Sequence, residues 1–232
     1  MPKASTLAVL VAAGRSARMG GGERKPFLDL AGTPVLARAA RALAAAPGVT
    51  WIVAVVAEED EARARATLRG VAKLAAVLPG GAERVDSVRA GVRWSGAEPE
   101  LVLVHDGARP LVTVAVIEAV LAGASTHGAA LAAVALADTL KRSRDGRMAE
   151  ETLAREGLWR AQTPQAFEAR RFRACLERAE REGLRPTDDA ALWERYVGPV
   201  ALVPDLPTNL KITTPADLEL ARALVAARPD LP

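Results

Sequence analysis

The sequence predicts an α/β protein built on a doubly wound, mostly parallel sheet. Short apolar runs bounded by turn residues recur along the 232 residues, and longer amphipathic stretches separate them. The runs are apolar throughout, which is typical of strands in a parallel sheet that helices cover on both faces. No internal repeat and no linker divides the chain, so we expect a single domain over residues 1–232.

Strands and helices are expected to alternate along the chain. The predicted strands cover residues 7–12, 51–56, 74–78, 101–104, 129–135 and 200–203. The predicted helices cover residues 34–46, 58–68, 85–94, 113–124, 166–182 and 215–227, with a short helix after Thr187 and Asp188. Thr33 and Pro34 are expected as the N-cap and first residue of the first helix. Thr214, Pro215 and Asp217 form a capping-box sequence before the last helix.

Residues 137–162 break the alternation. Two short stretches flank Asp145 and Gly146, a pattern that predicts two antiparallel strands around a turn. A hairpin at this point of the chain does not fit easily into a parallel sheet. We therefore expect a protruding β-arm that reaches a partner or covers a site.

The composition excludes several classes of protein. Lysine and arginine number 31 against 28 acidic residues, a net charge of +3, and no basic tract suggests nucleic-acid binding. Cys175 is the only cysteine, so no intramolecular disulfide forms, and His105 and His127 are too few for a Cys/His metal site. No apolar run is long enough to span a membrane and no signal peptide is evident, so we expect a cytoplasmic protein.

The loop after the first strand is rich in small and basic residues. Ala12, Ala13 and Gly14 would let the backbone approach a ligand closely, and exposed N–H groups there can bind anions. Positive charge follows at Arg15, Arg18, Arg24 and Lys25. Neither a P-loop motif nor the dinucleotide fingerprint occurs. The residues alone leave two interpretations open, a polyphosphate cradle or a glycine-rich surface loop with solvated arginines.

A second candidate site follows the strand at 101–104. Asp106 follows at the carboxyl end of this buried strand, where a carboxylate can hold Mg²⁺ against phosphate oxygens. The structural alternative is that Asp106 and Gly107 form only an Asp-Gly turn that ends the strand. No Gly-x-Ser-x-Gly elbow accompanies His105, so a buried, hydrogen-bonded histidine is favoured over a hydrolase triad.

Seven sequence blocks follow one another along the chain: AAGRSARM with the lysine at 25, GGAERVDSV at 80–88, VHDGARP at 104–110, DTLK at 138–141, REGLW with QTPQ at 155–165, TDDA at 187–190 and NLKIT at 209–213. In this order they resemble the 2-C-methyl-D-erythritol 4-phosphate cytidylyltransferase family, over about residues 7–224. The resemblance implies a Rossmann-like nucleotidyltransferase fold with a β-arm. It also implies that CTP and methylerythritol 4-phosphate give the CDP-linked alcohol and pyrophosphate, in the non-mevalonate route to isoprenoid precursors.

The resemblance also implies a role for individual residues. Arg18 and Lys25 match the pair that stabilises charge on the reacting phosphates, and Arg155 and Lys211 match residues that place the attacking phosphate. Asp106 matches the carboxylate for Mg²⁺, the implied cofactor. Contacts to the polyol phosphate are implied for Arg109, Thr139 and Thr187, and the CTP pocket for Ala12, Ala13, Gly14, Gly81, Ser87, Asp106 and Gly107. The excursion at 137–162 matches a dimerisation arm, so the implied assembly is a homodimer with its sites at the interface.

Each role has a structural alternative. Lys211 between Leu210 and Ile212 fits a strand lysine that reaches solvent, and Arg155 fits a solvated arginine. Ser87 fits an ordinary polar residue near a helix start, and Thr187 fits an N-cap.

The sequence departs from the family pattern beside two of these residues. Pro26 follows Lys25 where the family usually has glutamine, and Ala82 replaces a polar or acidic residue, which leaves the strictness for CTP open. Three other functions stay open as alternatives: a ribitol 5-phosphate cytidylyltransferase, a molybdopterin or sugar-phosphate nucleotidyltransferase, and a non-catalytic nucleotide-binding domain.

Overall fold

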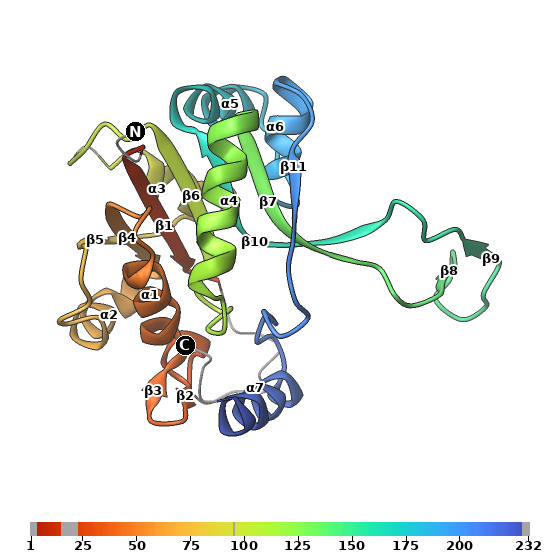
Figure 1. Ribbon diagram of the computed structural model, residues 1–232, viewed down its shortest axis with the longest axis horizontal. Coiled ribbons are helices and arrows are strands. Elements are labelled where there is room, and N and C mark those ends of the chain that lie inside the picture. Colours follow the sequence, from red (N-terminus) through yellow and green to blue (C-terminus); the bar gives the residue numbers. More distant parts are fainter. Residues whose placement is uncertain (1–3, 15–22, 95, 229–232) are drawn as a thin grey trace.

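One seven-stranded sheet forms the centre of the computed structural model, which describes residues 4–14, 23–94 and 96–228 (Figure 1). The strand order is β11-β7-β10-β6-β1-β4-β5. The bounds are β1 Thr6–Ala12, β4 Trp51–Val56, β5 Leu74–Pro79, β6 Leu101–Asp106, β7 Ala129–Ala135, β10 Trp159–Glu168 and β11 Ala201–Pro204. All neighbours pair in parallel except β10, which is antiparallel to both β6 and β7. The predicted doubly wound, mostly parallel sheet is confirmed.

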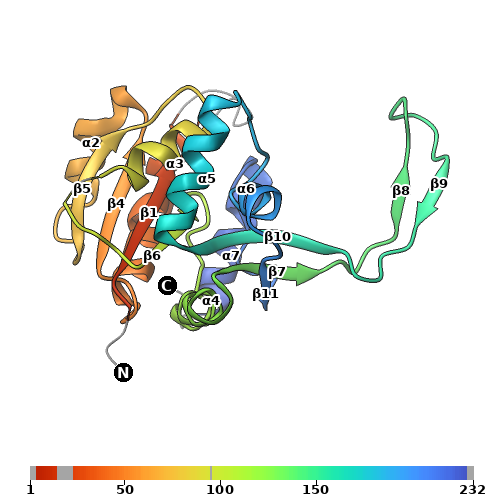
Figure 2. The ribbon, with the colours of Figure 1, turned by 90° about the horizontal axis from the view of Figure 1, so that it is seen from above.

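Helices cover both faces of the sheet. They are α1 Val35–Ala45, α2 Glu61–Thr67, α3 Arg84–Val92, α4 Val114–His127, α5 Ala169–Arg181, α6 Ala190–Tyr196 and α7 Pro215–Ala227. Ala8 and Leu10 of β1 belong to one core cluster with α1, α2 and α4, whereas Leu7 and Val9 belong to a second cluster with α3, α5 and α6. Figure 2 shows α4 on one side of the strands and α3 and α5 on the other. No helix in the described part of the chain is long and apolar enough to cross a membrane.

The antiparallel strand β10 was not predicted. A helix was expected from residue 166, but the strand continues to Glu168 and α5 begins at Ala169. Gln165, Ala166 and Phe167 pair with β6 on one side and β7 on the other, so they lie in the middle of the sheet. The polar Gln165 interrupts the apolar run by which the other strands were identified, and only the tertiary pairing reveals the strand.

The start of α1 also differs from the prediction. Thr33 and Pro34 form the short strand β3, which pairs with β2 (Asp29–Leu30) in a two-residue ladder. The helix begins one residue later than predicted, at Val35, and Pro34 occupies the N-cap position. The capping box before α7 is confirmed, because Thr214 accepts a hydrogen bond from the backbone N–H of Asp217 and the Asp217 side chain accepts one from Thr214.

A β-arm projects from the body of the molecule (Figures 1 and 2). Strands β8 (Leu140–Arg142) and β9 (Glu151–Leu153) pair antiparallel at its end, and the turn at Asp145 and Gly146 lies between them. Strand β10 begins at Trp159, within the range of 137–162 predicted for the arm, and pairs there with β7.

Gly91 sets how closely α3 approaches the sheet. A Cβ atom on Gly91 would lie 2.4 Å from Cγ1 of Val9 and 3.1 Å from Cγ2 of Val55. Both contacts are to fully buried side chains of β1 and β4 that cannot move away freely. We therefore expect Gly91→Ala to lower the free energy of unfolding by about 1–3 kcal/mol, although alanine is the better helix former. Denaturant unfolding measures this, and unchanged or raised stability would contradict the close approach of α3.

Candidate active site

The loops after β1 and β6 meet at one edge of the sheet. The chain runs from β1 outward to β4 and β5, then returns to β6 on the other side of β1, which creates a switch point between two carboxyl ends. The backbone N–H of Gly107 donates to the Val11 carbonyl at 2.8 Å, and a Cβ on Gly107 would lie 3.0 Å from that of Ala12. The structure thus brings together Ala12 and Gly107, two residues predicted for the nucleotide pocket, at the place where such sheets bind ligands.

Asp106 is the centre of a cluster of charged side chains. Strand β6 continues beyond its predicted end and includes Asp106. This residue is only 7% exposed. Nζ of Lys211 lies 2.8 Å from Oδ2, and Nη2 of Arg84 lies 3.2 Å from Oδ1. Nε of Arg109 is 3.8 Å from Oδ2. One buried carboxylate thus has three cations around it, which come from three separate parts of the chain.

The surrounding cations keep Asp106 ionised. Burial on its own would raise the pKa of the Asp106 carboxyl, but the charges of Arg84, Lys211 and Arg109 outweigh this and hold it well below its usual range. Burial on its own would lower the pKa of Arg84, but the carboxylates of Asp189 and Asp106 outweigh this and raise it above its usual value. The cluster is therefore charged on both sides throughout the neutral range.

Arg84 and Asp189 belong to the same group of charged side chains, although their places in the sequence suggest no role for either. Arg84 opens α3, and its Nη1 donates to Oδ2 of Asp189 at 2.8 Å while its Nε and Nη2 donate to Asp106. Asp189 is 1% exposed, and burial raises its pKa against the opposing charge of Arg84. Arg84 thus bridges two buried carboxylates. Its local sequence resembles that of the chain's many solvated arginines, so the bridge becomes visible only when α3 and α6 are placed beside β6.

His105 has a structural role, as the sequence analysis favoured. Its side chain is fully buried, and burial lowers its pKa to about 4, so the ring is neutral. Nε2 lies 3.0 Å from the Arg109 carbonyl and must donate to it, which leaves Nδ1 to accept from the Thr163 hydroxyl at 3.1 Å. The Thr163 hydroxyl in turn accepts from the backbone N–H of Asp106 at 3.0 Å. These three hydrogen bonds join the Arg109 carbonyl, the His105 ring, the Thr163 hydroxyl and the Asp106 backbone.

Ala13, Gly81 and Ser87 also lie together. A Cβ on Gly80 would lie 2.4 Å from that of Ala13 and 2.6 Å from Oγ of Ser87, so only glycine fits between them. The backbone N–H of Gly81 donates to Oγ of Ser87 at 3.2 Å. Ser87 is a buried polar residue in the first turn of α3, only 1% exposed. Gly14 follows Ala13 directly, so the predicted pocket residues converge from β1, β6 and the start of α3.

Lys25 is placed by the residues around it. It begins a short 3₁₀ helix, Lys25–Phe27, whose Pro26 and Phe27 are buried. Nε of Arg24 pairs with Oδ2 of Asp60 at 2.9 Å, and the Arg63 guanidinium stacks 4.1 Å above the Phe27 ring. These contacts fix the backbone on which Lys25 is carried. Arg18, the predicted partner of Lys25, lies outside the described residues.

Two predicted residues lie on the arm and not at the Asp106 cluster of this chain. Thr139 and Arg155 belong to the arm, where both are exposed and Arg155 donates to the Ala137 carbonyl. Thr187 is exposed and is not the N-cap of α6, because Asp189 occupies that position.

The acidic groups do not form a complete metal site on their own. No group of three or more His, Cys, Asp or Glu side chains that could hold a metal ion occurs among residues 4–14, 23–94 and 96–228. Asp106 offers an ionised carboxylate at the switch point. This suits a cation such as Mg²⁺, which is commonly bound by one or two carboxylates together with substrate phosphates.

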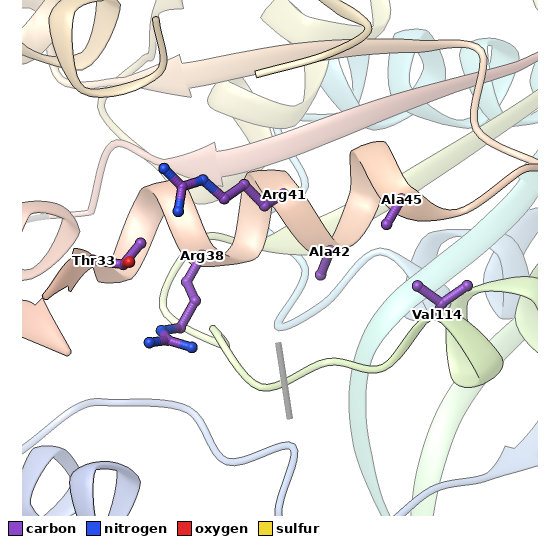
Figure 3. A pocket seen from close by; sticks show the side chains of 6 residues that line it. All are labelled: Thr33, Arg38, Arg41, Ala42, Ala45 and Val114. Carbon is purple, nitrogen blue, oxygen red and sulfur yellow. The ribbon is translucent and has the colours of Figure 1, made fainter. Parts of the chain in front are cut away.

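A cavity of about 300 Å³ lies elsewhere, along α1 (Figure 3). Figure 3 shows Ala42 and Ala45 on the side of α1 that faces Val114 at the start of α4. Its lining residues are Thr33, Arg38, Arg41, Ala42, Ala45 and Val114, and none of these six is a predicted site residue.

Comparisons with known proteins agree on one family. The family model described as 2-C-methyl-D-erythritol 4-phosphate cytidylyltransferase matches residues 6–227. A protein of that name from Pelotomaculum thermopropionicum is 44% identical over 225 residues, which cover 95% of this chain and 94% of the relative. The bifunctional enzyme IspD/IspF of Rhodospirillum rubrum is 46% identical over 224 residues, and the match covers 95% of this chain but only 57% of that longer protein.

A solved structure supports the same likeness. The crystal structure of 2-C-methyl-D-erythritol 4-phosphate cytidylyltransferase from Thermus thermophilus superposes with a TM-score of 0.79 at 33% identity. The match covers 94% of this chain and 98% of that one.

The bridge between Arg84 and Asp189 is expected to be worth more than a surface ion pair. Asp189→Asn removes the charge that holds Nη1 of Arg84, so we expect it to lower the free energy of unfolding by about 2–3 kcal/mol. Glu151→Gln is the matched control, since it breaks an exposed pair with Arg142 on the arm and should cost at most about 1 kcal/mol. Equal effects of the two substitutions on denaturant unfolding would count against the bridge.

Proposed function

The chain belongs to the 2-C-methyl-D-erythritol 4-phosphate cytidylyltransferase family, and from this premise we propose what its individual residues do. The protein joins CTP to 2-C-methyl-D-erythritol 4-phosphate, gives 4-diphosphocytidyl-2-C-methyl-D-erythritol and pyrophosphate, and acts in the non-mevalonate isoprenoid pathway. The ribitol 5-phosphate and non-catalytic alternatives are not favoured, because the family model and the curated relatives carry the methylerythritol name.

The cationic cluster around Asp106 is the observation that carries the proposal. A phosphate of one substrate must attack a phosphate of the other, so two polyanions have to meet and charge stabilisation dominates over proton transfer. Lys211 and Arg109 supply positive charge at the switch point. Both ring nitrogens of the neutral His105 already form hydrogen bonds, so His105 is not placed to act as a base. A phosphate dianion is already a nucleophile at neutral pH and needs no such base.

We assign the charge-stabilising roles to four residues. Lys25, with Arg18, stabilises the charge that develops on the α-phosphate and the leaving pyrophosphate of CTP. Lys211 and Arg155 place the attacking phosphate. The placement of Lys211 against Asp106 at 2.8 Å supports its part, because an ordered ammonium at the carboxyl ends of β1 and β6 faces the site where nucleotides bind in such sheets.

The remaining residues divide between the two substrates. Ala12, Ala13, Gly14 and Gly107 let CTP approach the backbone, while Gly81 and Ser87 offer polar groups to the edge of the cytosine. The acceptor is contacted by Arg109, Thr139 and Thr187. The convergence of Ala13, Gly81 and Ser87 around Gly80 supports the nucleotide part of this assignment.

Asp106 is the proposed carboxylate for a magnesium ion shared with CTP. Its depressed pKa and its position fit a hard cation that binds few protein ligands and several phosphate oxygens. The bound ion would supply positive charge that neutralises the triphosphate. Asp106 holds it, Arg84 keeps the Asp106 carboxylate oriented, and Lys211 and Arg109 complete the positive surroundings.

We further propose a homodimer in which the arm of each subunit completes the site of the other. Thr139 precedes β8 and Arg155 lies shortly after β9, so both belong to the arm, which projects from the body of the molecule (Figure 2). The arm also exposes large apolar side chains, with Met148 69% and Leu158 41% exposed, as a surface intended for a partner would. A cytoplasmic location for this dimer stays a prediction.

Pyrophosphate release tests the assignment of Lys25. With Mg²⁺, CTP and methylerythritol 4-phosphate the protein should release pyrophosphate, and chelation of the metal should abolish the release.

Lys25→Ala should lower kcat by about 10²–10³-fold because a charge contact to the transition state is lost. Lys73→Ala is the matched control, since Nζ of Lys73 binds the Ala46 carbonyl and has no proposed role. Equal turnover of the two folded variants would refute the role of Lys25.

Mixed dimers test whether the arm acts in trans. Lys25→Ala and Arg155→Ala homodimers should both be nearly inactive. In a mixed dimer the Arg155→Ala subunit keeps Lys25 and receives Arg155 from its partner, so one of the two sites is complete. Random mixing should then restore up to about a quarter of the wild-type rate. No recovery from verified mixed dimers, or full activity of a monomer, would contradict the shared site.

A further inference from the structure

The segment that carries Lys211 has no regular secondary structure. It runs from Asp205 to Thr214, between β11 and α7 (Figure 1), so neither a strand ladder nor a helix fixes the lysine. Lys211 is therefore not the strand lysine that its apolar neighbours allowed. On its carboxyl side, the backbone N–H of Ile212 donates to the Ala108 carbonyl at 2.8 Å. On its amino side, Asn209 holds the segment.

Asn209 makes four hydrogen bonds to the surroundings of the site. Its Nδ2 donates to the Thr163 carbonyl at 2.9 Å and to Oδ2 of Asp205 at 2.7 Å. Its backbone carbonyl accepts from Nη1 of Arg109 at 2.6 Å and from Nε2 of Gln162 at 3.2 Å. The residue is only 2% exposed, so these bonds form away from competing water.

The partners of Asn209 are the same residues that hold Asp106. The Thr163 hydroxyl accepts from the Asp106 backbone, while the Thr163 carbonyl accepts from Asn209. Arg109 follows Asp106 on the same loop and reaches both the Asp106 side chain and the Asn209 carbonyl. The hydrogen bonds of Asn209 therefore fix the backbone before Lys211 relative to Asp106, whose carboxylate the Lys211 ammonium contacts.

The chemistry of the position requires an amide. The Thr163 carbonyl and the Asp205 carboxylate are both acceptors, so the side chain between them must supply two donors. Aspartate has the same shape but donates nothing when ionised, and it would lie against the charge of Asp205. Asn209 is the only asparagine among the 232 residues.

We propose that Asn209 is a positioning residue for Lys211. By clamping the backbone two residues before the lysine, it sets where the ammonium lies relative to Asp106 and to the incoming phosphate. The inference rests on the proposed role of Lys211 in placing that phosphate. It adds that this placement comes from the amide of Asn209 and not from secondary structure.

The test is a double-mutant cycle on kcat. Asn209→Asp keeps the shape and removes both donors, and it should lower kcat about 10–100-fold, because small misplacements of a positioning group are costly. KM for CTP should stay within about twofold, since the proposed contacts of Lys211 are to the acceptor. In a Lys211→Ala background, the same substitution should change kcat by less than about twofold.

Two further variants guard against a purely structural effect. Glu168→Ala removes two bonds to the backbone N–H groups of Arg170 and Arg171 at the opposite edge of the sheet, so it should lower stability but leave kcat unchanged. Adding Asp205→Asn to Asn209→Asp restores one bond with donor and acceptor exchanged, and it should recover part of the lost kcat. If Asn209→Asp does not fold, Gln162→Met removes one of the two donors to the Asn209 carbonyl and should lower kcat about 3–10-fold.

The outcomes separate the two proposals. A folded Asn209→Asp variant with wild-type kcat, or the same fold-loss with and without Lys211, would overturn the clamp and leave the role of Lys211 intact. Wild-type kcat in Lys211→Ala would overturn the proposed role of Lys211 and the clamp with it.

Discussion

A buried carboxylate at the end of the central strand is the constraint on which the rest of the site depends. Asp106 is almost fully enclosed, and an unpaired charge in such a place would cost several kcal/mol. The fold meets this cost with Arg84 from the start of α3, Arg109 from the loop after β6, and Lys211 from the segment before α7. Three separate parts of the chain are thereby fixed to one point, and the elements that flank the proposed nucleotide pocket are fixed with them.

The neutral hydrogen bonds around Asp106 then give the charges a rigid support. Thr163 of β10 is central here, because its hydroxyl joins the Asp106 backbone to the neutral His105 ring and its carbonyl receives the amide of Asn209. An antiparallel strand inserted between β6 and β7 is therefore more than a departure from a parallel sheet. It is the element that brings Thr163 beside Asp106, and the same strand continues outward into the arm (Figure 2).

Local patterns were sufficient for the fold class and for most strands, because fully apolar runs and helix caps are local signals. They also placed Asp106 at the carboxyl end of a buried strand. The local patterns gave wrong or incomplete predictions where contacts between distant parts of the chain determine the structure. Gln165 makes β10 look unlike its neighbours, and Pro34 looks like a helix start although Thr33 and Pro34 pair with a strand. Arg84 could not be told from a solvated arginine, because its two partners come from strand β6 and the start of α6.

The cations of the cluster differ in what holds them, and this difference suits a site that must receive phosphates. Arg84 spans Asp106 and the buried Asp189, so it stays neutralised by carboxylates when other anions arrive. The side chain of Lys211 is 41% exposed and contacts Asp106 through a single ammonium on a flexible stem, while the backbone on either side of it is bound. A fixed arginine keeps the carboxylate in place, and a lysine with a fixed base and an exposed head can turn toward a phosphate.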